Sequence, residues 1–161
     1  MAGEIYCIDA SSLIKLKQDF PRAVFPSVWK RVEQLVVDTR LIAPDEVARE
    51  LEPDDELRPW AKQHKKMFRR INQQQLHSAQ EVMAEFPALA KPGKFGPAAD
   101  PFVVALARIE SQPADSLFKK AACVVVTEER GPQSIQGACR HFQIACATLI
   151  ELFQREGWVF H

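Results

Sequence analysis

The chain has 161 residues, of which 47% are hydrophobic, so it can bury one core and is too short for two comfortable domains. Lys plus Arg and Asp plus Glu both number 21, which excludes a global field that would attract nucleic acid. The amino terminus lacks the segments of a signal peptide, and no apolar run approaches the ~20 residues that cross a bilayer. We therefore expect a single cytoplasmic domain over residues 1–161 with no membrane partner.

Cysteine usage agrees with a reducing compartment. Cys7, Cys123, Cys139 and Cys146 form no C-x-x-C pair, and the first two lie in β-type apolar runs, where cysteine acts as a small hydrophobic residue. Cys139, His141 and Cys146 fit no standard zinc spacing. We expect four reduced thiols and no zinc site.

The first third of the chain predicts strands that alternate with helices. The apolar run at residues 5–9 is typical of a buried parallel strand and leads into a helix through residues 13–17. A second helix is expected from Ser27, and residues 41–43 predict a second strand. Pro44 can occupy the first turn of the next helix, where Glu50 lies.

The middle of the chain is helical and polar. Pro53 and Pro87 bracket two segments of helical periodicity, and acidic residues 54–56 stand where a helix should begin. Because no β-type run interrupts this region, we interpret residues 54–87 as a helical insertion or lid over the sheet. Residues 91–97 are rich in Pro and Gly and predict a loop.

The last third completes an α/β pattern. Asp100 is the expected N-cap of a helix whose first residue is Pro101. Residues 123–127 are continuous, apolar and β-branched, which is typical of a buried strand. The elements expected after it are a helix at 135–139, a strand at 142–146, a helix at 148–155 and a final edge strand at 158–160. This alternation predicts an α/β fold with a central, mostly parallel sheet.

Acidic residues stand where such a fold would bring them to one edge of the sheet. Asp9 closes the first strand, Glu50 lies in the helix after the second, Asp100 opens a helix, and Glu128 and Glu129 follow the clearest strand. Carboxylates at the carboxyl ends of parallel strands repel one another unless a cation lies between them. Singly, each residue is also typical of a helix cap, a solvated helix face or a surface turn. Together they predict a metal site.

The order of these segments resembles the signature of PIN domains over nearly the whole chain. The likeness is closest to a PIN-like family of unassigned function, which is itself similar to the toxin nucleases of toxin–antitoxin pairs. It rests on order and spacing rather than on one motif. The segments that carry it are residues 6–14, residues 25–29, residues 45–47, the helix that contains Glu50, residues 99–107 and residues 125–129.

The resemblance implies a three-layer α/β/α fold with an acidic ribonuclease site. Asp9, Glu50 and Asp100 match three acidic positions of the family pattern. The fourth position stands two residues after a threonine, which favours Glu129 beside Thr127, but Glu128 follows the same threonine and stays open. The residues implied for catalysis and metal binding are Asp9, Glu50, Asp100 and Glu129 or Glu128, with Ser11 and Thr127 in support.

The expected chemistry is metal-dependent cleavage of RNA. Carboxylate oxygens suit Mg²⁺ or Mn²⁺, and two such ions ~3.5–4 Å apart can activate water and stabilise the leaving oxygen of a phosphodiester. The resemblance implies an endoribonuclease, the toxin of a toxin–antitoxin module, with RNA as substrate and with a cognate antitoxin and a homodimer as expected partners. The main alternative is a catalytically silent PIN-type module that binds RNA or protein. A receiver-type phosphoacceptor domain is disfavoured, since Asp9 lacks an adjacent acidic residue and no lysine ends the strand at 123–127.

Two groups of basic residues are candidates for RNA contact. One falls at helical spacing inside the predicted insertion and comprises Arg58, Lys62, Lys65, Lys66, Arg69 and Arg70. An ordinary solvated helix face explains this group equally well. Lys91 and Lys94 flank the loop before Asp100, and that position favours contact with phosphates.

Overall fold

A computed structural model describes residues 3–91, 98–111 and 122–161. These residues form a five-stranded sheet in the order β3-β2-β1-β4-β5, and every pairing in it is parallel. The strands are β1 (Ile5–Ile8), β2 (Leu41–Pro44), β3 (Phe68–Arg69), β4 (Cys123–Val126) and β5 (Ala145–Ala147). The predicted α/β class with a parallel sheet is confirmed.

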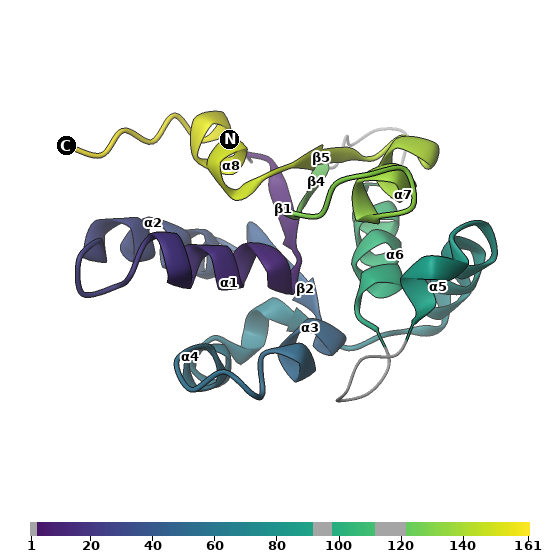
Figure 1. The fold of residues 1–161 in the computed structure, drawn as a ribbon, viewed down its shortest axis with the longest axis horizontal. Helices are drawn as coiled ribbons and strands as arrows, with labels where there is room; N and C mark the ends of the chain where they lie inside the picture. The colour runs from purple at the N-terminus through teal and green to yellow at the C-terminus, as the bar shows by residue number, and fades with distance from the viewer. Residues whose placement is uncertain (1–2, 92–97, 112–121) are drawn as a thin grey trace.

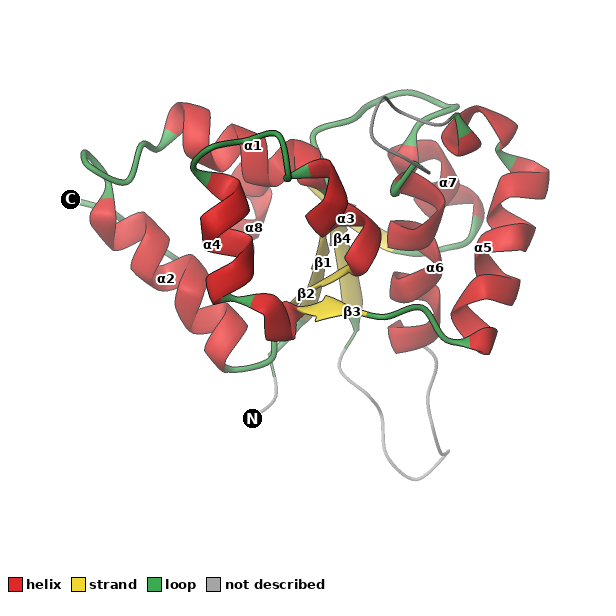
Figure 2. Cartoon of the chain, turned by 90° about the horizontal axis from the view of Figure 1, so that it is seen from below, coloured by secondary structure: helices red, strands yellow, loops and turns green. Residues whose placement is uncertain are grey.

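Helices cover both faces of the sheet, which confirms the three-layer arrangement (Figure 1, Figure 2). One layer holds α1 (Ala10–Asp19), α2 (Pro26–Val37), α4 (Leu57–Gln63) and α8 (Leu149–Arg155). The other holds α5 (Gln73–Glu85), α6 (Asp100–Ser111) and α7 (Ile135–His141). The short helices are α3 (Asp45–Glu50) and the 3₁₀ turns η1 (Lys65–Met67) and η2 (Pro87–Ala90). None of the described helices has the length and apolar character needed to cross a bilayer.

The core is continuous because the inner strands are covered on both sides. All residues of β2 and β4 are buried, as the sequence of a parallel strand between two helical layers requires. α6 buries five consecutive residues, 103–107, so it is enclosed on most of its circumference. Its first residue, Asp100, is thereby fixed at one edge of the sheet.

Two strand predictions are corrected in the middle and last thirds. Region 54–87 is not purely helical, because β3 lies within it and pairs with Ala43 and Pro44 of β2. The strand expected at 142–146 forms instead at Ala145–Ala147. Gln143 has a φ of 58°, so the chain turns at this point and cannot yet be extended.

Residues 158–160 do not form the edge strand that their sequence suggests. Gly157 has a φ of 69°, which ends the turn after α8 in the left-handed region. The rings of Trp158 and Phe160 then pack on Phe153, with centroids 5.3 Å and 6.0 Å from it. The apolar residues of this segment therefore cover α8 rather than extend the sheet.

A polar network joins the amino end of β1 to the end of α8. The buried Tyr6 donates a hydrogen bond to Glu156 Oε2 at 2.6 Å, and Arg40 donates to both carboxylate oxygens of Glu156 at 2.9 Å and 2.6 Å. Burial alone would raise the pKa of Glu156, but the bonds from Arg40 and Tyr6 outweigh it and lower that pKa. The carboxylate is thus a structural anion.

We predict that Glu156→Gln lowers the free energy of unfolding by about 2 kcal/mol, because it removes a half-buried charge pair, and lowers Tm by roughly 6 °C. Since the folded pKa lies below the unfolded value near 4.5, this stabilisation is present above that pH and is lost as the pH falls. Thermal melts of wild type and variant should therefore converge in acid. Glu52→Gln, at an exposed position, is the matched control, and an equal loss in both variants would contradict the assignment.

Candidate metal centre

Three carboxylates converge where the parallel strands end. β1 and β4 are neighbours with aligned ends, so Asp9, which follows β1, lies beside Thr127, which follows β4. Asp100 enters from the start of α6, and Glu129 from the turn after β4. Ligand oxygens of Asp9, Asp100 and Glu129 all lie within 4.8 Å of one another, so the three can hold a metal ion. We refer to them as the carboxylate cluster.

Asp9 is the buried member of the carboxylate cluster, with only 2% of its surface exposed. Its Oδ1 accepts a hydrogen bond from the Ala10 amide at 2.8 Å, which makes it the N-cap of α1. Its Oδ2 accepts from Ser11 Oγ at 2.7 Å and from Thr127 Oγ1 at 3.0 Å. Burial raises the pKa of Asp9 despite these donors, which favour the ionised form.

The hydroxyls of Ser11 and Thr127 also fix the turn that carries Glu129. Ser11 Oγ accepts from the amide of Glu128 at 3.0 Å, and Thr127 Oγ1 accepts from the amide of Glu129 at 3.2 Å. Each hydroxyl therefore donates to Asp9 and accepts from the turn after β4. Both residues lie where the sequence predicts supporting groups, and they couple the position of Asp9 to that of Glu129.

Asp100 and Glu129 are close enough for each to affect the pKa of the other. Burial, followed by repulsion from Asp9, Glu129 and Glu50, raises the pKa of Asp100 to about 8. Burial and repulsion from Asp9 also raise the pKa of Glu129, although a hydrogen bond with Asp100 acts in the opposite direction. Without a cation, the raised pKa of Asp100 favours its protonated form, which can donate a hydrogen bond to Glu129.

Glu50 lies beside the carboxylate cluster without belonging to the closest three. Its Oε1 accepts from the Ala99 amide at 2.9 Å, which ties α3 to the start of α6. Burial, with repulsion from Asp9, raises the pKa of Glu50. One turn earlier on the same face of α3, Glu46 is 6% exposed, and its Oε2 has no hydrogen-bond partner among the described residues. Helical spacing puts Glu46 and Glu50 on one face of α3, but no local sequence pattern predicts that Glu46 is buried.

Glu128 makes its hydrogen bonds away from the carboxylate cluster. Its Oε2 accepts from Ser12 Oγ at 2.6 Å and from the Leu149 amide at 3.0 Å, so it joins the first turn of α1 to the first residue of α8. It is absent from the carboxylate cluster, whereas Glu129 is present. The structure therefore brings Glu129, two residues after Thr127, to the other acidic side chains.

The predicted basic residues are spread over more than one surface. Lys66 and Arg69 line a pocket beside β2 that contains no member of the carboxylate cluster, and Lys62 lies on α4. Lys91 is exposed directly after η2. Lys94 lies outside the described residues. Lys91 directly follows η2, and η2 lines the same cleft as Asp100 and Glu129. Of the predicted basic residues that are described, Lys91 is therefore the one close to the carboxylate cluster.

That cleft has a volume of about 520 Å³ and runs from Asp100 and Glu129 to the turn at residues 130–134. Arg130 lines it and donates a hydrogen bond to Glu151 at 3.1 Å. Sequence reasoning did not select Arg130, although its position directly after Glu129 was a usable signal. The cleft provides room for a ligand immediately beside the carboxylates.

The donor set fits a hard divalent cation. Its ligand atoms are carboxylate oxygens, and among the described residues no salt bridge neutralises Asp9, Glu50, Asp100 or Glu129. Burial raises the pKa of Asp9, and burial followed by repulsion from Asp9 raises the pKa values of Glu50, Asp100 and Glu129. A bound cation would offset both effects. The fold and this set define a parallel α/β domain with an acidic centre able to hold a metal ion.

Comparison with known sequences assigns the chain to a family. It belongs to the family described as a domain of unknown function (DUF4411), whose model matches residues 6–160. The matched range includes every residue of the carboxylate cluster. No match was found among curated proteins.

We predict that substitutions of Glu128 and Glu129 have different effects, the first on stability and the second on metal binding. Glu128→Gln should lower the free energy of unfolding by about 1–2 kcal/mol, because the carboxylate that joins α1 and α8 loses its charge. Glu129→Gln should leave Tm in chelator unchanged or slightly higher and should remove the rise in Tm on addition of Mn²⁺. Thermal melts with and without Mn²⁺ measure both effects. The reverse pattern would place Glu128 in the cluster.

We predict that, in chelator, the protein loses stability as pH rises from about 4 to 8. The folded pKa of Asp100, about 8, exceeds its unfolded value of 3.8, so the folded state binds more protons in this window and its free energy of unfolding falls with pH. Asp100→Asn should flatten this dependence. At pH 8, Mn²⁺ at 100 times its Kd should stabilise wild type by about 2.7 kcal/mol and the variant much less. A wild-type Tm that ignores both Mn²⁺ and chelator would exclude the metal site.

Proposed function

We propose that this protein is a PIN-like, Mg²⁺- or Mn²⁺-dependent endoribonuclease. The observation that carries the proposal is the convergence of Asp9, Asp100 and Glu129 within 4.8 Å, with no salt bridge to any of the three among the described residues. The order of these residues along the chain is similar to the acidic pattern of PIN nucleases. Glu50 supplies a fourth carboxylate at the rim of the same group.

Bound Mg²⁺ or Mn²⁺ would activate water and stabilise the leaving oxygen of a phosphodiester. The residues of the chain would hold the ion and orient the carboxylates around it. Asp9, with three hydrogen-bond donors, has a fixed carboxylate orientation, which lowers the cost of arranging the ligands around an ion. Asp100 would release its proton when a cation replaces the repulsion from its neighbours. Glu50, bound to the Ala99 amide, keeps Asp100 in place through the start of α6.

RNA is the substrate that we propose for the cleft beside the cluster. The cleft is open along the turn after Glu129, and Arg130 stands at its wall with about half of its side chain exposed. A guanidinium at this position suits the phosphate next to the scissile one. Lys91, exposed after η2, extends the same positive flank.

By the same resemblance, we propose that the protein acts as the toxin of a toxin–antitoxin pair and that a cognate antitoxin controls it. A catalytically silent module would keep the cluster and the cleft but would not cut. Metal binding without cleavage of any RNA would favour that function, so binding and cleavage must be measured on the same preparation.

We predict that Asp9→Asn lowers Mn²⁺-dependent cleavage of single-stranded RNA by at least ~100-fold, because the central ligand loses its charge. Asn also caps helices well, so α1 and the fold should persist. Cleavage of a labelled oligonucleotide and Mn²⁺ binding by calorimetry are the two measurements. Asp55→Asn, on an exposed turn, is the matched control. Equal cleavage by wild type and Asp9→Asn would sink the mechanism.

A further inference from the structure

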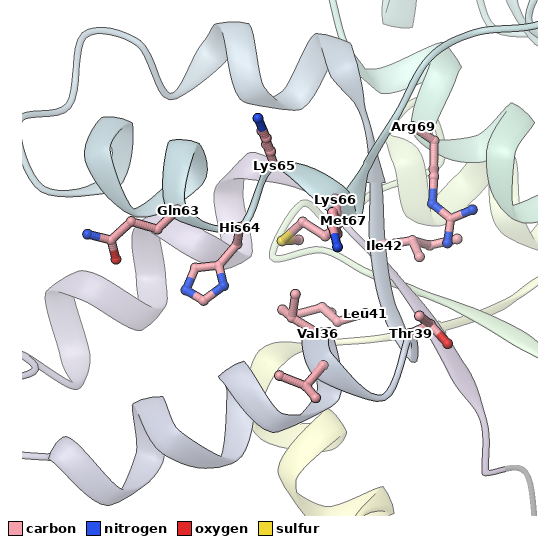
Figure 3. Close-up of a pocket in the computed structure, with 11 residues that line it drawn as sticks. Val36, Thr39, Leu41, Ile42, Gln63, His64, Lys65, Lys66, Met67 and Arg69 are labelled. Atoms are coloured by element: carbon pink, nitrogen blue, oxygen red, sulfur yellow. The ribbon is translucent and has the colours of Figure 1, made fainter.

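A second concave site lies apart from the carboxylate cluster, beside β2. It has a volume of about 460 Å³, within the ~300–1,000 Å³ of sites that enclose a ligand. We call it the β2 pocket. Its lining comes from the end of α2, from β2, from η1 and from β3, and it includes none of the acidic residues described above (Figure 3).

The β2 pocket has an aliphatic floor and a basic rim. Figure 3 shows Val36 and Leu41 on one side of it and Met67 on the other, with Ile42 beside them. Val37, at the end of α2, extends this apolar surface and is 71% exposed. Leu41, Ile42 and Met67 are only 1–2% exposed and form the floor, so Val37 is the large apolar side chain of the lining that stays open to water, where a partner could cover it.

The rim is positive and lacks internal partners. Lys65, Lys66 and Arg69 line the β2 pocket, and no Asp or Glu does. None of the three makes a salt bridge within the described part of the chain. In Figure 3, Lys66 and Arg69 run from η1 and β3 toward the side where Leu41 and Ile42 lie. The Nε of Arg69 is buried without an acceptor, a cost that an anionic ligand would remove.

The β2 pocket lies beside the edge of the sheet, where η1 packs against β2. β3 is the outermost strand and has only two residues, which pair with Ala43 and Pro44. Leu41 and Ile42 of β2 therefore continue past the end of β3 toward the pocket. So short an edge strand offers little backbone for pairing, and the side chains of the β2 pocket must therefore carry the contact with a partner.

A basic rim can attract either RNA or an acidic protein segment, and the residues that line the β2 pocket favour one of these two ligands. A site for single-stranded RNA combines cations with aromatic rings on which bases stack. No Phe, Tyr or Trp lines the β2 pocket, and the ring of its one lining histidine, His64, already packs on Trp60 with centroids 4.8 Å apart. The floor of the pocket is aliphatic. A protein segment in which aliphatic side chains are flanked by carboxylates matches both the aliphatic floor and the basic rim of the pocket. Lys66 and Arg69 are thus better suited to a protein partner than to RNA.

We propose that the β2 pocket docks a short extended segment of a partner protein, in which one or two aliphatic side chains are flanked by Asp or Glu. The aliphatic side chains lie against Val36 and Val37 at the mouth of the pocket, and the flanking carboxylates pair with Lys66 and Arg69. This contact does not involve the carboxylate cluster. The β2 pocket can therefore dock a partner whatever reaction the cluster performs.

Selection from a displayed library of random dodecapeptides tests the proposal. Binding to the full chain, with counter-selection on the Lys66→Ala/Arg69→Ala protein, should enrich peptides that carry Leu, Ile or Val between acidic residues. The double variant should bind a selected peptide about tenfold more weakly, and Val37→Asp should weaken it similarly by placing a like charge at the mouth. Lys30→Ala/Arg31→Ala, which removes two exposed charges from α2 outside the pocket, should leave the affinity unchanged.

Methyl spectra locate the contact. A selected peptide should shift the methyl signals of Ile42 and Met67 and leave that of Ile150 on α8 unchanged. The Asp9→Asn protein should bind as wild type does, so failure of the nuclease proposal would not be mistaken for failure of this one. Selection without an acidic–aliphatic consensus, or equal affinity for wild type and both pocket variants, would overturn the proposal. So would shifts of the Ile42 and Met67 methyls by an oligouridylate or by inorganic phosphate but not by the peptides.

Discussion

The junction of β1 and β4 is the constraint on which the acidic edge depends. Asp9 leaves β1 as the cap of α1, and the hydroxyls of Ser11 and Thr127 bind its second oxygen while they hold the turn after β4. A displacement of either strand by one residue would move these hydroxyls away from Asp9. The register of two parallel strands thus fixes where a negative charge is buried, and the other acidic side chains are arranged around that charge.

Magnitudes explain why such an arrangement calls for a cation. A hydrogen bond to a charged group contributes about 1.5–3 kcal/mol, whereas two unit charges 4 Å apart near a protein surface repel by about 4 kcal/mol. The three donors to Asp9 can therefore offset the repulsion from one or two neighbouring carboxylates but not from three. Burial, followed by the remaining repulsion, raises the pKa of Asp100 and favours its protonated form when no ion is present. A divalent cation stabilises all of these carboxylates at once, and the proposed nuclease chemistry uses the same stabilisation.

The basic residues of the middle region illustrate how one charge pattern can serve several surfaces. Lys62 lies on α4, while Lys66 and Arg69 follow a change of direction at η1 and line the β2 pocket. Their helical spacing in the sequence therefore does not produce one continuous face. Arg130 lines the cleft beside Asp100 and Glu129 instead, and Lys91 directly follows η2, which lines the same cleft. Two concave surfaces of different chemistry result, one acidic at its base with cations on its flank, the other aliphatic with a basic rim.

The sequence alone determined the fold class and the identity of most acidic residues, because both follow from local patterns. Continuous β-branched runs predict buried parallel strands, and Asp9 and Asp100 stand at helix starts that local rules recognise. The carboxyl ends of such strands share one edge, so the approach of these residues followed as well.

Tertiary structure decided the features that depend on contacts between distant segments. Glu128 and Glu129 are identical in type and adjacent, and only the positions of Ser12 and the Leu149 amide direct the first away from the cluster. β3 exists because Ala43 and Pro44 offer it a partner, whereas residues 158–160, with a stronger strand pattern, lie where Phe153 is available for packing. Propensity is local, but pairing, burial and the side on which a carboxylate finds its donors are properties of the assembled layers.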